Sequence, residues 1–433
     1  MRIAVVGAGI VGVTTAQALL EDGHEVTVFE RQGSVATEGS FANAGFVAPG
    51  YVTPWAAPGM AAKVLGQVFR RDAAVRLAGI PGPALTAWLW RWWRACSATR
   101  YAASRAAMLA LARDSQQRTH ALALSQGIEH ERSRGVLVLL RGDAEVAQTR
   151  AGLKVLAELG VNFHLVGPEA CRQIEPALEA GTSLKAGIHL PDSESGNCRQ
   201  FALELKSVLQ RCGVQFHFHH AVQSLAAGAD VKLLVRSTAP SAGGGPGEPS
   251  PSREVAFDAV VVCAAMGAPA LLPSLRLPVQ PVHGYSVTLP VRRHDGYPDL
   301  APRAALMDER YKVAITRLGD RVRVAGSAEL GGDTEAMRPA ALATLYRVLE
   351  DWFPAAVRQT GSAQTWKGAR PMLPDGPPAI GPTGHPGVWV NTGHGSSGWA
   401  LACGSARLVA DLIGGRSPAV DAAPFSPRRW RGA

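Results

Sequence analysis

Cysteine is scarce in this sequence, and its spacing gives no sign of a metal centre. Six cysteines occur in 433 residues, with no Cys-x-x-Cys pair and no histidine at the spacing typical of zinc. We therefore expect reduced thiols that mostly serve packing. His217, His219 and His220 form one small cluster, in which strand alternation would place His217 and His219 on one face. Because no acidic side chain accompanies them, we predict no metal site.

Long apolar runs are also lacking. The single candidate, residues 3–20, is interrupted by two threonines, one glutamine and three glycines. These interruptions argue against a membrane-spanning helix and against a signal peptide. We therefore expect a cytoplasmic protein that at most binds peripherally to the inner membrane.

Acidic residues are outnumbered, since 35 Asp and Glu stand against 44 Lys and Arg, a formal net charge of +9. This charge permits contact with an anionic surface. The basic residues are spread along the chain and no nucleic-acid module is recognisable, so we predict no nucleic-acid partner. A chain of 433 residues with 47% hydrophobic residues can bury a large core, and two domains are expected.

What the sequence does contain is a complete nucleotide-binding unit at its start. A β-branched strand at residues 3–6 leads into the turn Gly7-x-Gly9-x-x-Gly12, a helix, and a second strand at residues 24–29. In such a unit Gly7 makes the tight turn, Gly9 lets a pyrophosphate approach the backbone, and Gly12 lets helix and strand pack closely. The N–H groups at the helix start then bind the phosphates.

An acidic residue closes this unit. Glu30 ends the second strand, 23 residues after Gly7, where a carboxylate can bind both hydroxyls of an adenosine ribose. We therefore predict a dinucleotide without a 2′-phosphate. The motif alone does not distinguish FAD from NAD.

A segment rich in tryptophan, arginine and proline follows at residues 53–113, and two interpretations stay open. Tryptophan and arginine with few acidic residues suit a membrane interface, where the indole is amphipathic and arginine meets lipid phosphates. Alternatively, the tryptophans pack a helical subdomain under the site, because tryptophan is usually substantially buried. Just upstream, residues 40–51 are dense in small side chains, which allow a flat ligand to approach the backbone closely.

The rest of the chain shows strand and helix patterns. Helices are predicted at residues 101–125, 148–159, 168–174, 199–211, 339–352 and from 398 onward. Strands are predicted at residues 135–140, 231–236, 255–257, 259–267, 285–289, 313–317, 322–326 and 388–391, with residues 214–222 as a third parallel strand. Residues 237–252 are rich in Pro, Ser and Gly, and we interpret them as a mobile hairpin tip without catalytic importance.

Five blocks carry a resemblance to a known family: residues 42–45 with 49–59, 284–286, 308–317, 368–376 and 391–399. In this order they resemble the FAD-dependent amine and amino-acid oxidoreductases of the D-amino-acid oxidase, glycine oxidase and sarcosine oxidase superfamily. Within it, they are similar to the small subunit of bacterial D-amino acid dehydrogenase. The sequence departs from the family pattern at Phe46, at Val47, at His283 in place of a common lysine, and in the insertion near residue 240. His283 can retune the substrate pocket.

The resemblance implies an α/β fold, with a Rossmann-like FAD-binding domain and an α+β substrate domain built on an antiparallel sheet. It assigns residues 1–60, 186–280 and 365–433 to the FAD-binding domain. Residues 61–185 and 281–364, which include the Trp/Arg-rich helical segment, form the substrate domain. Because no histidine or cysteine attachment site stands near the N-terminal loop, we predict that FAD is bound non-covalently.

The resemblance also implies which residues hold FAD. Residues 43–45 would lie along the flavin ring, and Val222 would contact the adenine side through its backbone. The last helix would point its N–H groups at the pyrimidine edge, where its dipole favours negative charge. The expected cofactor-binding residues are Ile3, Val6, Gly7, Ala8, Gly9, Ile10, Val11, Gly12, Glu30, Arg31, Asn43, Ala44, Gly45, Val222, Gly267, Gly395, Ser396, Gly398 and Trp399.

Four residues are expected to act on the substrate. Arg370 stands in the block Gly-x-Arg-Pro, whose family arginine binds the substrate carboxylate, and a planar guanidinium can do so with two hydrogen bonds. The alternative is that Arg370 only anchors the turn. Tyr285 and Tyr311 are expected on strands bordering the pocket, although either ring could simply pack on a sheet face. His394 could bond the flavin or the substrate, or have a structural role in its turn.

The implied reaction is oxidative deamination of D-amino acids to 2-oxo acids and ammonia, by hydride transfer from Cα to flavin N5. Electrons would pass to a quinone or another electron-transfer acceptor. An oxygen-using D-amino-acid, glycine or sarcosine-type oxidase and a D-hydroxyproline or D-proline dehydrogenase remain alternatives. An NAD-linked reductase is disfavoured, because nicotinamide has no use for the last helix start or the Asn43 loop. A non-catalytic, membrane-associated nucleotide-binding subunit is the alternative from another class.

Overall fold

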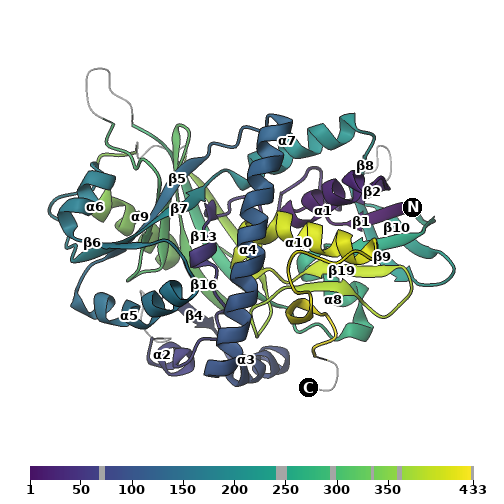
Figure 1. The fold of residues 1–433 in the computed structure, drawn as a ribbon, viewed down its shortest axis with the longest axis horizontal. Helices are drawn as coiled ribbons and strands as arrows, with labels where there is room; N and C mark the ends of the chain where they lie inside the picture. The colour runs from purple at the N-terminus through teal and green to yellow at the C-terminus, as the bar shows by residue number, and fades with distance from the viewer. Residues whose placement is uncertain (68–73, 240–250, 293–298, 333–335, 358–362, 431–433) are drawn as a thin grey trace.

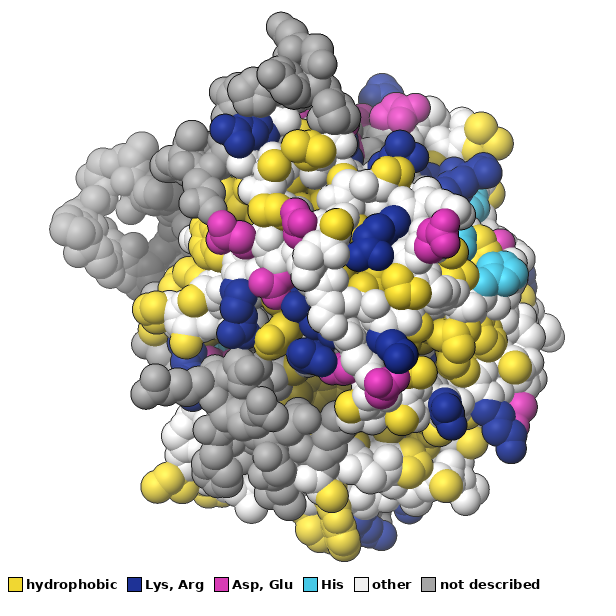
Figure 2. Space-filling view, turned by 90° about the vertical axis from the view of Figure 1, so that its left-hand side faces the viewer, with side chains coloured by type: hydrophobic (Ala, Val, Ile, Leu, Met, Phe, Trp, Pro, Cys, Tyr) yellow, Lys and Arg dark blue, Asp and Glu magenta, His cyan; other side chains and the backbone are white. Residues whose placement is uncertain are grey.

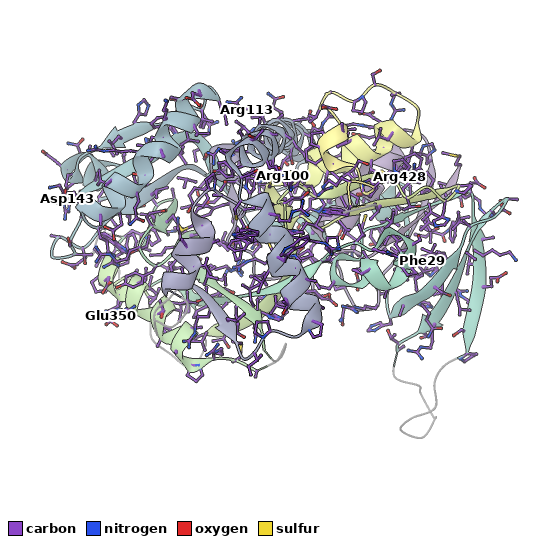
Figure 3. The ribbon with its side chains drawn as sticks, turned by 90° about the horizontal axis from the view of Figure 1, so that it is seen from below. Phe29, Arg100, Arg113, Asp143, Glu350 and Arg428 are labelled. Atoms are coloured by element: carbon purple, nitrogen blue, oxygen red, sulfur yellow. The ribbon has the colours of Figure 1, made fainter. Side chains whose placement is uncertain are left out.

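Two sheet-containing halves lie on either side of a long helix, α4 (Ala98–Gln126), as Figure 1 shows. The computed structural model describes residues 1–433 except 68–73, 240–250, 293–298, 333–335, 358–362 and 431–433. Seen from below, Phe29 and Arg428 lie toward one end of the molecule, and Asp143 and Glu350 lie toward the other (Figure 3). On the end formed by the half with Asp143 and Glu350, Lys and Arg side chains are interspersed with Asp and Glu side chains (Figure 2).

The first half is a six-stranded nucleotide-binding sheet, and it confirms the Rossmann-like prediction. The strand order is β18-β19-β12-β1-β2-β8, with only β18 running antiparallel to its neighbour. The strands are β1 (Arg2–Val6), β2 (Glu25–Phe29), β8 (Gln215–His217), β12 (Ala259–Val262), β18 (Ala379–Pro382) and β19 (Val388–Thr392). One face packs on the helices α1 (Ile10–Glu21), α7 (Cys198–Arg211), α10 (Gly398–Ile413) and α4.

A small antiparallel sheet covers the other face, and it corrects one predicted strand. It contains β9 (His220–Ala226), β10 (Val231–Ser237) and β11 (Ser252–Phe257). The predicted single strand 214–222 is wrong, because the chain turns at His219, whose φ is +56°, and only β8 joins the parallel sheet. His217 and His219 therefore do not share one strand face. Most of the predicted hairpin tip, residues 240–250, lies outside the described residues.

The second half is a larger mixed sheet in the order β17-β13-β16-β15-β14-β5-β7-β3. Most pairs are antiparallel, as predicted, but β14 runs parallel to β5, and the additional strand β4 runs parallel to β16. The strands are β3 (Phe46–Val47), β4 (Val75–Ala78), β5 (Ser133–Leu140), β6 (His164–Val166), β7 (Ala186–Ser195), β13 (Gln280–Pro290), β14 (Ala305–Asp308), β15 (Val313–Leu318), β16 (Arg321–Gly331) and β17 (Gln364–Met372). In this sheet β7 pairs with β5, and β17 pairs with β13. The predicted domain boundaries instead assigned the residues of β7 and β17 to the FAD-binding domain.

Helix α9 (Pro339–Trp352) covers one face of this mixed sheet, and it matches the predicted range. The remaining helices are α2 (Met60–Gln67), α3 (Pro83–Ala95), α5 (Asp143–Glu158), α6 (Pro168–Ile174) and α8 (Ala268–Leu271). Helix α4 begins where the Ser97 side chain accepts a hydrogen bond from the Arg100 N–H, and it ends at Gly127 in the left-handed conformation. No helix in the described ranges is long and apolar enough to cross a bilayer.

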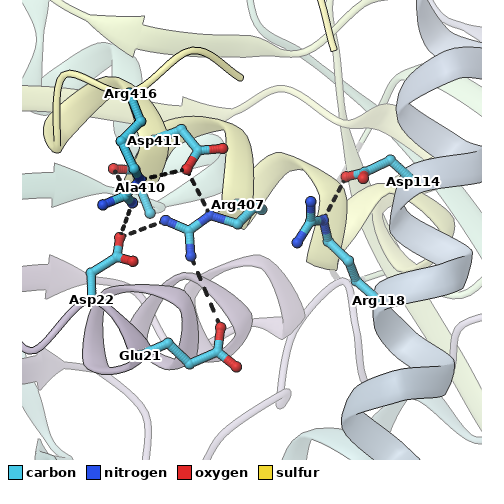
Figure 4. Close-up of polar contacts among 8 residues, drawn as sticks. All are labelled: Glu21, Asp22, Asp114, Arg118, Arg407, Ala410, Asp411 and Arg416. Atoms are coloured by element: carbon cyan, nitrogen blue, oxygen red, sulfur yellow. Dashed lines mark hydrogen bonds and ion pairs between the residues drawn. The ribbon is translucent and has the colours of Figure 1, made fainter. Parts of the chain in front are cut away.

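Charged contacts fasten the first helix to the last one (Figure 4). Arg407 of α10 binds Asp22, which follows α1, at 2.5 Å, and Asp411 at 3.1 Å. Arg416 contacts the same two carboxylates. Burial alone would raise the pKa of Asp22, but the hydrogen bonds from Arg407 and Arg416 outweigh it and lower that pKa. The network holds together the two helices whose N-terminal ends are predicted to face the dinucleotide.

The tryptophans of α3 divide between two environments. Trp88 and Trp92 are buried, with exposed fractions of 3% and 7%, and the Trp88 indole N–H donates to the Met372 carbonyl of β17. Trp90 and Trp93 keep 51% and 61% of their surface exposed. Helix α3 therefore has one packed face and one exposed aromatic face.

Candidate active site

The N-terminal turn contains two glycines that the protein itself requires. Gly7 has φ of +102°, and a Cβ there would lie 2.8 Å from the Cys263 carbonyl oxygen. A Cβ at Gly12 would overlap the Gly7 carbonyl oxygen. Gly9 differs, because its φ of −65° suits any residue and the nearest atom to its Cβ would be Ser40 Oγ at 3.6 Å. None of the described neighbours demands glycine at position 9, so the residue fits the close approach of a bound phosphate group.

Glu30 lies beside this turn, as the sequence predicted. Its Oε2 accepts a hydrogen bond from the Ala8 N–H at 2.7 Å, and its Oε1 accepts from the Gln32 N–H at 2.8 Å. Both oxygens thus stay close to the backbone at the carboxyl end of β1 and β2, where a ribose would bind. The neighbouring Arg31 is exposed and pairs with Glu38 at 2.6 Å.

The flavin loop, which we define as residues 43–45, lies against the mixed sheet. Asn43 Oδ1 accepts from the Gly45 N–H at 2.8 Å, and the Ala44 carbonyl accepts from Thr316 Oγ1 at 2.7 Å. Gly45 has φ of +87°, and a Cβ there would lie 3.0 Å from the Gly196 carbonyl oxygen. The loop therefore joins the nucleotide-binding half to the sheet that carries the candidate substrate residues.

Arg370 lies deep in the protein on β17, with part of its surface accessible, as expected for a side chain that lines a site. Its Nη1 donates to the Ser327 carbonyl at 2.9 Å, and among the described residues it makes no ion pair with a carboxylate. Burial lowers the pKa of Arg370 to about 10, which still leaves a cation at neutral pH. A deeply placed, partly accessible guanidinium with a neutral partner is suited to receive an anionic ligand.

Sequence reasoning missed two residues that place this guanidinium. Gly284 on β13 provides the space for it, because a Cβ there would overlap Nη2 of Arg370. Ser327, with φ of +61°, lies where the pairing between β13 and β16 shifts register, and its carbonyl faces Arg370. Gly284 stood inside a family block, and Gly368 lies opposite it on β17. The available signal was a glycine in each of two family blocks, although the sequence alone did not show that the two glycines face each other.

Tyr285 does not lie beside Arg370. It follows Gly284 directly on β13, so alternation turns its side chain to the opposite face, toward α9. Its hydroxyl donates to Glu329 Oε2 at 3.2 Å, and the Lys367 ammonium lies 5.3 Å from the ring centroid. Burial raises the pKa of Tyr285. His283, expected to retune the pocket, is buried on the same face, opposite Glu329.

Tyr311 also lies away from Arg370. Its ring packs against the guanidinium groups of Arg141 and Arg347, at 5.1 and 4.6 Å from the ring centroid. Its backbone N–H donates to Asp308. Tyr285 thus packs on a face of the sheet, the alternative that was left open for it. The expectation of a strand position is wrong for Tyr311, which lies in the turn between β14 and β15.

His394 lies at the start of the last helix and is almost fully buried. Its Nε2 lies 3.0 Å from Ser405 Oγ, and burial lowers the pKa of His394 to about 3, so the ring is neutral at working pH. A bridge between His394 and Met372 places this helix start beside β17. The Trp399 indole is buried and packs on Phe201.

Comparison with known proteins identifies the family. The model of the family described as FAD dependent oxidoreductase matches residues 2–412. The chain is 38% identical to a D-amino acid dehydrogenase of Bradyrhizobium diazoefficiens, over 99% of each chain. It is 41% identical to a D-amino acid dehydrogenase of a Methylobacterium species, over the full length of both. The chain belongs to the FAD-dependent oxidoreductase family.

The fold of this FAD-dependent oxidoreductase is similar to that of a solved oxidase. The crystal structure of glycine oxidase from Geobacillus kaustophilus superposes with a TM-score of 0.71 at 21% identity and covers all of both chains. The resemblance predicted from the five sequence blocks is therefore confirmed. FAD as the cofactor is confirmed as well.

The remaining predicted FAD ligands of this oxidoreductase lie on β1, on β9, after β12 and at the starts of α1 and α10. Val222 is on β9, and the nearby His220 N–H donates to the Glu30 carbonyl at 2.8 Å, which keeps β9 beside β2. Gly267 ends the short helical turn after β12. The others are Ile3, Val6, Ala8, Ile10 and Val11 on β1 and the α1 turn, and Gly395, Ser396 and Gly398 at the α10 start. Their contacts with FAD stay predictions.

The variant Gly284→Ala tests the packing of Arg370. The new methyl group should displace the guanidinium, which sits at the flexible end of a long side chain, without unfolding the sheet. We expect KM for the amino-acid substrate to rise about tenfold while the FAD content stays that of the wild type. Gly167→Ala is the control, because a Cβ at Gly167 would meet nothing within 4 Å. An unchanged KM would show that Arg370 tolerates the methyl group.

Proposed function

We propose that this enzyme is a D-amino acid dehydrogenase, which oxidises D-amino acids to 2-oxo acids and ammonia. The observation that carries the proposal is Arg370, a deeply placed guanidinium with no carboxylate partner among the described residues. It projects from the same face of the mixed sheet that contacts the flavin loop. The two relatives compared above, which match over nearly their whole length, carry this name.

Arg370 would bind the α-carboxylate through two parallel hydrogen bonds and so fix the orientation of Cα. Gly284 and the Ser327 carbonyl hold the guanidinium in place. Bound FAD supplies the hydride acceptor. His394 is neutral and hydrogen-bonded to Ser405, so it adds no positive charge to the helix start that would face the flavin. The substrate amine would enter neutral, or lose its proton on leaving water.

The visible spectrum of the purified holoenzyme tests this function. Under anaerobic conditions, D-alanine or D-proline is added, and each L-enantiomer is added to a parallel sample. Bleaching of the flavin band by D-forms alone is the expected result. Bleaching by D-proline and not D-alanine would indicate a D-imino acid dehydrogenase, and bleaching by L-forms would overturn the proposed stereochemistry.

We also propose that the electrons pass to a quinone met at a membrane surface, which would make the enzyme peripheral on the inner membrane. The exposed face of α3 supports this, since it presents Trp90 and Trp93, with Arg94 lying 4.8 Å from the Trp90 ring centroid. Ile80, just before α3, is 97% exposed. Aromatic, aliphatic and cationic side chains together suit the lipid interface. Rapid oxygen uptake with no quinone reduction would instead indicate an oxidase.

The double variant Trp90→Ser/Trp93→Ser tests this membrane surface. Each exposed indole inserted into lipid should contribute about 1.5 kcal/mol, so the pair should weaken binding by about 100-fold. Co-sedimentation with vesicles of phosphatidylethanolamine and phosphatidylglycerol measures the change. Leu234→Ser, an exposed apolar position on β10, is the control. Equal sedimentation of all three proteins would contradict an α3 membrane contact.

A further inference from the structure

Three buried polar side chains form a row across the mixed sheet. Thr288, Arg323 and Thr316 stand opposite one another on β13, β16 and β15. Residues in direct register project from the same face, so these side chains lie next to each other. Arg323 Nε donates to Thr288 Oγ1 at 3.0 Å. Arg323 is only 4% exposed.

Two members of this row hold successive carbonyls of the flavin loop. Arg323 Nη1 donates to the Asn43 carbonyl at 3.0 Å, and Thr316 Oγ1 donates to the Ala44 carbonyl at 2.7 Å. The next residue, Gly45, accepts at its carbonyl from the Gly196 N–H at 2.9 Å. Three consecutive loop residues are therefore fixed by partners outside the loop. The position of the loop relative to the sheet that carries Arg370 depends on these bonds.

Arg323 brings a positive charge to this position. Its two contacts are a hydroxyl and a peptide carbonyl, and within the described ranges it makes no ion pair. The nearby Arg321 already binds the Glu131 carboxylate, at 2.9 Å. Burial, and then repulsion from Arg321, lower the pKa of Arg323 to about 10, so it remains charged at neutral pH. A buried cation with neutral partners acts strongly on any charge that develops nearby.

We propose that Arg323 is a positioning residue for the flavin, which acts through the Asn43 carbonyl and whose charge raises the reduction potential of bound FAD. A reduced flavin carries more negative charge than an oxidised one, so a fixed cation beside its loop stabilises the reduced form. The proposal rests on FAD binding and not on the identity of the amino-acid substrate. It can therefore fail while the proposed function stands, and the reverse is also true.

Four variants separate positioning from charge: Arg323→Met, Arg323→Lys, Thr316→Val and the control Arg317→Met. Arg317 follows Thr316 on β15, but its guanidinium forms an ion pair with Asp299. The dissociation constant of FAD is measured by flavin fluorescence on the apoprotein. The midpoint potential is measured on each holoenzyme by equilibration with a reference dye.

For Arg323→Met we expect FAD to bind about tenfold more weakly. The reduced flavin should also become about tenfold less stable relative to the oxidised flavin, which lowers the midpoint potential by about 30 mV. Arg323→Lys should restore most of the potential but not the affinity. Thr316→Val should weaken FAD binding about threefold and leave the potential unchanged. Arg317→Met should match the wild type in both.

The result that would overturn the proposal is an Arg323→Met enzyme with wild-type FAD affinity and wild-type potential. If that variant does not fold, the other two decide. Wild-type FAD affinity in both Thr316→Val and Arg323→Lys would show that the bonds to the loop do not position the flavin. A lowered potential in Thr316→Val would show that the potential does not report the charge.

Discussion

Replacing Arg370 by methionine should lower kcat/KM for a D-amino acid by about 10³-fold, because truncating one partner of a buried charged pair costs about 4 kcal/mol. Arg370 is placed by a single carbonyl bond and by the space at Gly284, so methionine leaves the sheet intact. Anaerobic reduction of the flavin by rapid mixing measures the loss directly. Arg370→Lys should recover part of it, since lysine keeps the charge without the planar fork.

The control for this variant is Arg338→Met. The Arg338 guanidinium forms an ion pair with Glu329 at 2.9 Å, on the other face of the same sheet. We expect less than about a threefold change in kcat/KM, because Lys367 still pairs with Glu329. If Arg370→Met keeps wild-type kcat/KM with FAD bound, Arg370 only anchors its turn and the proposed substrate contact is wrong.

Gly12→Ala should abolish stable FAD binding. The added methyl group would overlap the carbonyl oxygen of Gly7. The methyl group is fixed to the backbone and the oxygen belongs to it, so neither atom can rotate away. Helix α1 must therefore move from β1, which displaces the N–H groups that would face the phosphates. We expect the affinity for FAD to fall by at least about 100-fold, equivalent to about 2.7 kcal/mol. The ratio of flavin to protein absorbance after purification measures it.

Gly152→Ala serves as the matched control for that variant. Gly152 lies inside helix α5, and a Cβ there would meet nothing within 4 Å. Alanine should leave the FAD content unchanged and stabilise the helix by up to about 1 kcal/mol. A Gly12→Ala protein that purifies with full flavin content would contradict the close packing of α1 on the turn.

Local sequence signals predicted the elements of this fold well where one signal dominated. The unit from β1 to β2 followed from its glycines and β-branched runs, and α6 and α9 begin and end at the predicted residues. The strand 214–222 was wrong because alternation continues through Phe218 and His219 without glycine or proline to mark the turn. A positive φ at a histidine leaves no such mark in a single sequence.

The site was predictable in part. Arg370 stood in a family block, but the face of β13 and β17 that surrounds it depends on pairing between segments more than 80 residues apart along the chain, such as Gly284 and Gly368. Without that register, Tyr285 and Gly284 could not be assigned to opposite faces. Arg323 and Thr316 were missed for the same reason, since their function depends on contacts with Asn43 and Ala44 near the other end of the chain.

Because α1 is held to α10 by ion pairs, the order in which the two helices are synthesised affects when the FAD site can form. Arg407 and the helix start at Gly398 are synthesised about 400 residues after Gly7. At about 5 to 20 residues per second, the N-terminal turn waits about 20 to 80 seconds for the helix that completes its pocket. FAD would then be captured only after α10 has been synthesised.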